Sequence, residues 1–193
     1  MIIYFEGVDG SGKSTLLQQI SLMLKKENYE VIEDGNKLIP THPKSENRIS
    51  EENLYKELHR MAKSPKIYLL DRGPISDDVY RQFDKLPPVT RLVSIIDFVR
   101  LHNNSIFTIY CRTEKAEEYM RQRGDDNPVA LKNHRAISEI YDIVMARYAD
   151  QVKNVRVYDF TKTGEFTNLM SAIKIFCYKG VERYEQTNDE VRA

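Results

Sequence analysis

The feature that most constrains this chain is a glycine-rich segment close to its start. Residues 7–14 read G-V-D-G-S-G-K-S, which fits the pattern G-x-x-x-x-G-K-[ST]. A short apolar run at residues 2–6 precedes the segment, and residues 13–26 carry apolar side chains at helical spacing. A strand, a glycine-rich turn and a helix in this order predict a loop whose backbone N–H groups wrap a phosphate.

Individual residues of this loop have predicted roles. Its glycines allow the backbone to curl so that several N–H groups face inward. Lys13 is expected to reach the β- and γ-phosphates of a nucleoside triphosphate, and the Ser14 hydroxyl is expected to ligate Mg²⁺. The predicted ATP-binding residues are Gly7, Asp9, Gly10, Ser11, Gly12, Lys13, Ser14 and Thr15. The alternative is a turn that holds no ligand, which the agreement of pattern and context disfavours.

Strand-like and helix-like segments alternate along the rest of the chain. Further strands are expected near residues 30–33, 66–70, 105–111 and 155–160, and further helices near residues 51–63, 89–101, 114–122, 132–148 and 165–176. Alternation of this kind predicts a parallel sheet with helices on both faces. We expect a three-layer α/β fold of the P-loop class with strand order 2-3-1-4-5. One domain would span residues 1–178, and residues 179–193 would form a charged, fraying tail.

Composition limits the partners. Lys plus Arg total 29 and Asp plus Glu total 29, so the formal net charge is zero, whereas proteins that bind nucleic acid usually carry a basic excess. Nucleic acid is therefore not expected as the main partner. No apolar run is long enough to span a membrane. Cys111 and Cys177 form no spaced framework and are expected to be free thiols, as in the cytoplasm. The histidines show no metal-ligand spacing.

A second acidic site follows the third predicted strand, which ends in Asp71-Arg72. Ligands of open α/β sheets bind beyond the carboxyl ends of the strands, so Asp71 is expected near the phosphates, where its carboxylate can hold Mg²⁺ directly or through water. Arg72 is suited to a bidentate grip on a second phosphate. A surface salt bridge at a strand end is an equally weighted alternative.

These segments together resemble thymidylate kinase and the related nucleoside-monophosphate kinases. Residues 5–15 (FEGVDGSGKST) are similar to that family's phosphate loop, of which Asp9 is the distinguishing residue. Residues 71–80 (DRGPISDDVY) are similar to its D-R-x-x-x-S-x-x-x-Y segment in residue types and spacing. The resemblance covers residues 2 to about 176 and weakens after residue 135.

The resemblance implies roles for the residues that match. Asp9 would contact the 3′-hydroxyl region of the acceptor and the water shell of the metal, and Arg72 would grip the acceptor's phosphate. Ser76 and Asp77 would line the base pocket, while Tyr80 would press on the 2′ edge of the sugar and favour deoxyribose. Without the motif, Tyr80 would be interpreted as a core aromatic residue.

The segment 112–135 resembles the basic lid of that family. A kinase needs a mobile cation that neutralises charge on the transferring phosphoryl group. Some relatives place an arginine inside the phosphate loop, but this chain has Gly10 there, so the lid must supply the cation. The candidates are Arg121, Arg123 and Arg135, and the alternative for each is a solvated basic helix end.

The chain also departs from the family. It has no Arg-Glu-Pro segment after the second strand, where residues 34–43 stand instead. Arg60 is a candidate, by rough spacing, for a family arginine that contacts the base. Gly73 replaces a bulky residue, and Asp77 replaces a neutral one and would accept hydrogen bonds from a base donor. These departures leave the acceptor base open.

The expected reaction is transfer of the γ-phosphoryl group of ATP, with Mg²⁺, to a deoxynucleoside monophosphate, with dTMP as the first candidate. One alternative is a kinase that phosphorylates a deoxynucleoside 5′-hydroxyl and needs a general base, for which Glu33 is available. Another is a P-loop ATPase or a polynucleotide 5′-kinase. The helix predicted at residues 89–101 is either a homodimer face, as in relatives, or part of the core.

Overall fold

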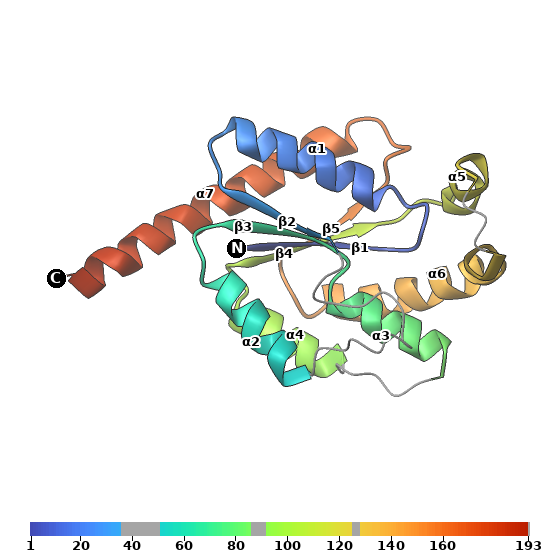
Figure 1. Ribbon diagram of the computed structural model, residues 1–193, viewed down its shortest axis with the longest axis horizontal. Helices are drawn as coiled ribbons and strands as arrows, with labels where there is room; N and C mark the ends of the chain where they lie inside the picture. The colour runs from blue at the N-terminus through green and yellow to red at the C-terminus, as the bar shows by residue number, and fades with distance from the viewer. Residues whose placement is uncertain (36–50, 86–91, 125–127, 193) are drawn as a thin grey trace.

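A computed structural model describes residues 1–35, 51–85, 92–124 and 128–192, and its centre is a five-stranded parallel sheet (Figure 1). The strands lie in the order β2-β3-β1-β4-β5. Their bounds are β1 (Ile2–Glu6), β2 (Val31–Gly35), β3 (Ile67–Asp71), β4 (Ile106–Cys111) and β5 (Val155–Tyr158). This order confirms the predicted α/β fold of the P-loop class, and all carboxyl ends meet at one edge of the sheet.

Helices cover both faces of the sheet (Figure 1). One face packs against α1 (Lys13–Lys26) and α7 (Glu165–Arg192). The other face packs against α2 (Glu51–Ala62), α3 (Pro74–Phe83), α4 (Leu92–Leu101) and α6 (Pro128–Ala149). The short helix α5 (Ala116–Gln122) follows β4 beyond the carboxyl edge. No helix within the described ranges is both long enough and apolar enough to cross a membrane.

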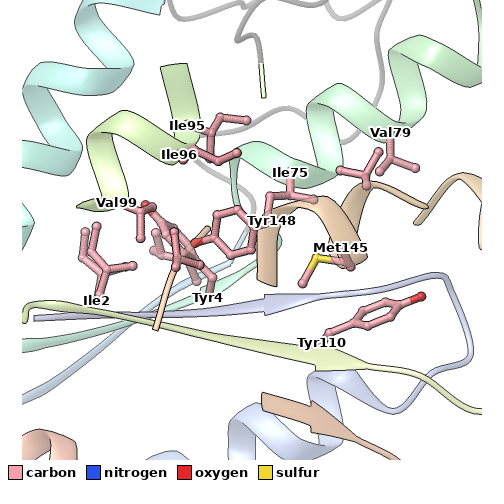
Figure 2. Close-up of a cluster of buried hydrophobic side chains, with 14 of the residues drawn as sticks. Ile2, Tyr4, Ile75, Val79, Ile95, Ile96, Val99, Tyr110, Met145 and Tyr148 are labelled. Carbon is pink, nitrogen blue, oxygen red and sulfur yellow. The ribbon is translucent and has the colours of Figure 1, made fainter. Parts of the chain in front are cut away.

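The two cores follow from alternation along β1, because successive side chains of a strand point to opposite faces. Ile3 and Phe5 pack with α1 and α7. Ile2 and Tyr4 pack with the other helices, in the cluster that Figure 2 shows between the sheet and α3, α4 and α6. Glu6 continues the second set, so the sequence places a carboxyl group at the end of a buried apolar row.

Two helices differ from the sequence prediction. Helix α3 was not among the helices expected from the sequence, yet Pro74 at its first position is suited to start a helix, and Ile75 and Val79 are buried one turn apart. Helix α7 continues to Arg192 instead of ending at Phe176, so residues 179–192 are helical.

Helix α4 packs largely into the core. Ile95, Ile96 and Val99 are buried, whereas Val93 and Leu101 are exposed. Both cysteines are free and buried, as expected. Some expectations concern residues outside the described ranges: most of the 34–43 segment, the start of the 89–101 helix, residues 125–127 of the lid segment, and Ala193.

Candidate active site

The phosphate loop joins β1 to α1 at the carboxyl edge of the sheet (Figure 1). Gly10 and Gly12 have φ angles of 79° and 83°, in the left-handed region that favours glycine. Gly12 precedes α1 as its N-cap, no side chain caps the helix, and no acidic residue occupies its first turn. The N–H groups of that turn therefore suit an anion in the mouth of the loop.

Neighbouring segments hold the loop closely. A Cβ atom at Gly10 would lie 2.2 Å from the carbonyl oxygen of Ala116, and one at Gly12 would lie 2.9 Å from the ring of Phe160. Helix α5 and the segment after β5 therefore support the loop from behind. The glycine positions are sterically required as well as conformationally suited.

Lys13 is buried inside the loop, with 6% of its surface exposed. Its Nζ donates a hydrogen bond to the carbonyl oxygen of Val8 over 2.7 Å. Burial and, to a smaller extent, the neighbouring Arg72 lower the pKa of Lys13 to about 8, while Asp9 and Asp71 oppose this change. A phosphate oxygen is a stronger acceptor for this amine than the loop carbonyl, because both partners would then be charged.

Asp71 and Ser14 form the candidate metal-binding pair. The Ser14 hydroxyl donates to Asp71 Oδ2 over 2.9 Å. The other carboxylate oxygen, Oδ1, is buried and has no hydrogen-bond partner among the described residues. Mg²⁺ takes oxygen ligands and uses one or two carboxylates together with substrate phosphates. A buried carboxylate oxygen without a partner, beside a hydroxyl at the loop, therefore fits Mg²⁺.

Arg72 lies on the opposite side of the sheet edge, toward α3 and α6. Its side chain is buried, and its Nη1 donates to the Gly7 carbonyl over 3.1 Å and to the Tyr141 hydroxyl over 3.2 Å. Its Nη2 forms an ion pair with Asp9. The guanidinium also lies 5.1 Å from the ring centroid of Tyr80. Arg72 has a φ of 79°, a strained angle for a non-glycine residue that is typical of functional sites.

Of the residues predicted to bind the acceptor, some contact Arg72 and others are paired elsewhere. Asp9 and Tyr80 both contact Arg72. Ser76 is buried and bonded to Glu6 and Tyr141, so its side chain faces the core. Asp77 pairs with Arg81 over 3.1 Å, and both side chains are largely buried.

Two candidates lie away from the loop. Arg60 pairs with Glu57 and lies 5.8 Å from the ring centroid of Tyr68. Tyr68 is opposite Ile2 in the sheet, so Arg60 is at the amino edge, and the spacing argument that placed it near the base was misleading. Glu33 accepts hydrogen bonds from Lys25 and Ser21 of α1, which hold its pKa below the usual value.

The three lid arginines are all exposed: Arg121 lies on α5, Arg123 just after it, and Arg135 on α6. Arg121 donates to Glu117 over 2.7 Å, and Arg135 donates to Glu139 over 3.0 Å, each one turn away on its own helix. Arg123 is exposed just after α5. The described structure therefore pairs Arg121 and Arg135 with helix neighbours rather than with the phosphate loop.

Sequence reasoning missed three residues that hold the site together. Glu6 is fully buried and accepts hydrogen bonds from the Gly73 amide, over 2.8 Å, and from Ser76. Burial raises the pKa of Glu6 to about 7, although Ser76 and Arg72 oppose this change. Tyr141 contacts Arg72, and His134 Nε2 lies 3.1 Å from the Asp9 carbonyl oxygen. The available signal was a charged residue at the end of an apolar strand, directly before the loop.

Gly73 is the position where this chain departs from the bulky family residue, and Glu6 explains the departure. A Cβ atom at Gly73 would lie 2.6 Å from Glu6 Oε1 and 2.7 Å from the Tyr4 ring. Gly73→Ala should therefore lower the free energy of unfolding by about 1–3 kcal/mol, the usual cost of overpacking, measured by urea denaturation. In a Glu6→Ala background the same change should cost less. Equal costs in the two backgrounds would contradict this explanation.

The sheet order, the loop and its lysine define an α/β fold of the P-loop class. Solved structures of two proteins share this fold. The YorR protein from Bacillus subtilis, in complex with phosphorylated GDP, is 20% identical, with a TM-score of 0.64 over 91% of this chain and 96% of that one. Deoxyadenosine kinase from M. mycoides, with the products dCMP and a flexible dCDP bound, is 19% identical, with a TM-score of 0.52 over 90% and 98% of the two chains.

No protein-family model matches the chain, and no curated protein sequence matches it. At identities of 20% and 19%, the similarity to the two solved structures establishes the fold alone.

Proposed function

We propose that the protein transfers the γ-phosphoryl group of ATP to a nucleoside monophosphate, with dTMP as the first candidate acceptor. The observation that carries this proposal is a pair of buried cations at one sheet edge. Lys13 lies inside the phosphate loop, and Arg72 lies beside the loop, bonded to Gly7 and Asp9. One cation suits the donor's phosphates, and the other suits the phosphate that receives the transferred group.

The chemistry asks little of the protein beyond placement and charge. The attacking oxygen of a monophosphate is already anionic, so no strong general base is needed. Lys13 would neutralise charge on the β- and γ-phosphates, and Arg72 would orient the acceptor's phosphate toward them. Ser14 and Asp71 would hold Mg²⁺, which when bound neutralises further negative charge on the phosphates.

The ion pair between Asp9 and Arg72 supports an acceptor site at this place. Asp9 is about half exposed, whereas Arg72 is buried and held by other contacts as well. An entering phosphate would compete with Asp9 for the guanidinium, and the more exposed Asp9 side chain would turn aside. Its carboxylate could then accept a hydrogen bond from the sugar's 3′-hydroxyl. Tyr80, over the guanidinium, would border the same sugar.

The candidate general base of a nucleoside kinase does not support that alternative. Glu33 faces α1 and is engaged by Lys25 and Ser21. Ser21 is seven residues along α1 from Ser14, which is about 10 Å along the helix axis. The hydrogen bonds also keep the pKa of Glu33 low, which makes its carboxylate a weak base.

A coupled assay with ATP and Mg²⁺ against every ribo- and deoxynucleoside monophosphate, and against the matching nucleosides, tests the proposal. At least one monophosphate should turn over, and its nucleoside should be phosphorylated at least about 100-fold less efficiently, because it lacks the group that Arg72 binds. A preference for nucleosides would overturn the proposal and indicate a 5′-hydroxyl kinase. An oligonucleotide with a 5′-hydroxyl end is included in the same assay, and turnover of that substrate alone would indicate a polynucleotide kinase.

A further inference from the structure

A chain of hydrogen bonds leads from the candidate acceptor cation into the core. Arg72 Nη1 lies 3.2 Å from the Tyr141 hydroxyl, and that hydroxyl lies 2.7 Å from the Ser76 hydroxyl. The Ser76 hydroxyl in turn contacts Glu6 Oε2. Glu6, Ser76 and Tyr141 are buried, so water does not substitute for any member of this chain.

The two end members, Arg72 and Glu6, fix the hydrogen positions in this series of hydrogen bonds. A guanidinium has donors only, so Arg72 donates to Tyr141. Glu6 Oε1 already accepts from the Gly73 amide, and when the carboxylate is ionised Oε2 also accepts, so Ser76 donates its single proton there. Ser76 must then accept from Tyr141. All donors point one way, from Arg72 toward Glu6.

We propose that Glu6 is a positioning residue for Arg72: its carboxylate, acting through Ser76 and Tyr141, fixes the guanidinium in the orientation that receives the acceptor's phosphate. The expected effect on acceptor binding rests on the proposed function, whereas the hydrogen bonds between Glu6 and Arg72 do not depend on that function. Glu6 is fully buried beneath Gly73 and Tyr4. Its carboxylate is therefore shielded from the substrate, and the hydrogen bonds through Ser76 and Tyr141 connect it to Arg72.

Reversing the direction of the hydrogen bond at Glu6 disrupts the whole series of hydrogen bonds. In Glu6→Gln the amide oxygen can still accept from Gly73, but the amide nitrogen then faces Ser76 and donates to it. Ser76 then either donates to Tyr141, which leaves the Tyr141 proton without an acceptor, or still accepts from Tyr141, which leaves its own proton without one. In both cases one buried hydroxyl proton loses its acceptor within this set of hydrogen bonds. The substitution keeps the shape of the side chain, so its effect comes from hydrogen-bond direction.

Two pairs of matched variants test the proposal by acceptor binding at about pH 8. Tyr141→Phe should weaken binding of the monophosphate about five- to tenfold, the effect of one buried hydrogen bond, and leave the KM for ATP unchanged. Tyr148→Phe is its control, because Tyr148 also lies on α6 and its buried hydroxyl contacts Thr108 rather than Arg72. Glu6→Gln should weaken binding similarly, and its control Glu33→Gln should not.

Calorimetry gives the dissociation constants, and thermal melting confirms that each variant folds. If Tyr141→Phe and Glu6→Gln bind the monophosphate as tightly as the wild type, or if both substrates' constants change equally, the positioning role is wrong. If the wild type itself binds no monophosphate, the proposed function fails instead. The Arg72 Nε–Hε resonance in NMR spectra then tests the hydrogen bonds between Glu6 and Arg72 without any substrate. This resonance should shift in Tyr141→Phe and in Glu6→Gln. An unchanged resonance would overturn the positioning role.

Discussion

Replacing Arg72 with alanine should lower kcat/KM for the acceptor monophosphate about 100-fold or more, because removing one partner of a buried charge pair costs several kcal/mol. Most of the loss should appear in acceptor binding, since Lys13 and the loop remain to hold ATP. Steady-state kinetics with each substrate varied in turn, together with calorimetric titration of the monophosphate, measure this effect.

Arg60→Ala is the matched control for this variant. Arg60 was predicted from spacing to contact the acceptor's base, but it lies at the amino edge of the sheet and pairs with Glu57. Its removal should change acceptor kinetics less than twofold. Wild-type kinetics in Arg72→Ala with every monophosphate tried would remove the basis for the acceptor site, and a large loss in Arg60→Ala would revive the spacing argument.

Lys13→Ala should lower kcat about 100- to 1,000-fold, the usual cost of losing one group that stabilises charge in the transition state. The amine is buried within the loop and donates to the Val8 carbonyl, so its removal takes the cation out of the loop. ATP binding should also weaken, whereas monophosphate binding, which depends on Arg72, should change little. Rapid-quench or coupled assays at saturating acceptor report the rate.

Lys25→Ala is the corresponding control on the same helix. Lys25 is half exposed and pairs with Glu33, far along α1 from the loop. The control should retain wild-type kcat. If Lys13→Ala keeps more than about a tenth of the wild-type kcat, the loop lysine does not perform the predicted role.

Local sequence patterns predicted the loop and the sheet well. The span of α1 agrees with its predicted bounds, because a glycine turn starts the helix and apolar spacing continues through Leu24. The strand order also agreed, since a phosphate loop after the first strand implies a known arrangement of parallel strands. Asp71 and Ser14 meet as expected, because the loop and the end of β3 share one edge.

Long-range contacts were beyond local patterns. Glu6, Ser76 and Tyr141 come from three distant segments, and only the folded chain brings them together. Ser76 was assigned to the base pocket from its motif position, yet it faces the core. The extension of α7 was missed because charge was taken as a sign of fraying. Gly180 is also unfavourable within a helix. The structure explains its presence in α7, because a Cβ atom at this position would collide with the Met1 side chain.

Helix α6 contacts both halves of the site. His134 reaches the carbonyl oxygen of Asp9 in the loop, and Tyr141 reaches Arg72. Seven residues separate them, so they lie on the same face of the helix, about 10 Å apart along its axis. One helix therefore holds the loop backbone at Asp9 and the side chain of Arg72 through two contacts of fixed spacing, and rotation of α6 about its own axis would carry both contacts in the same direction.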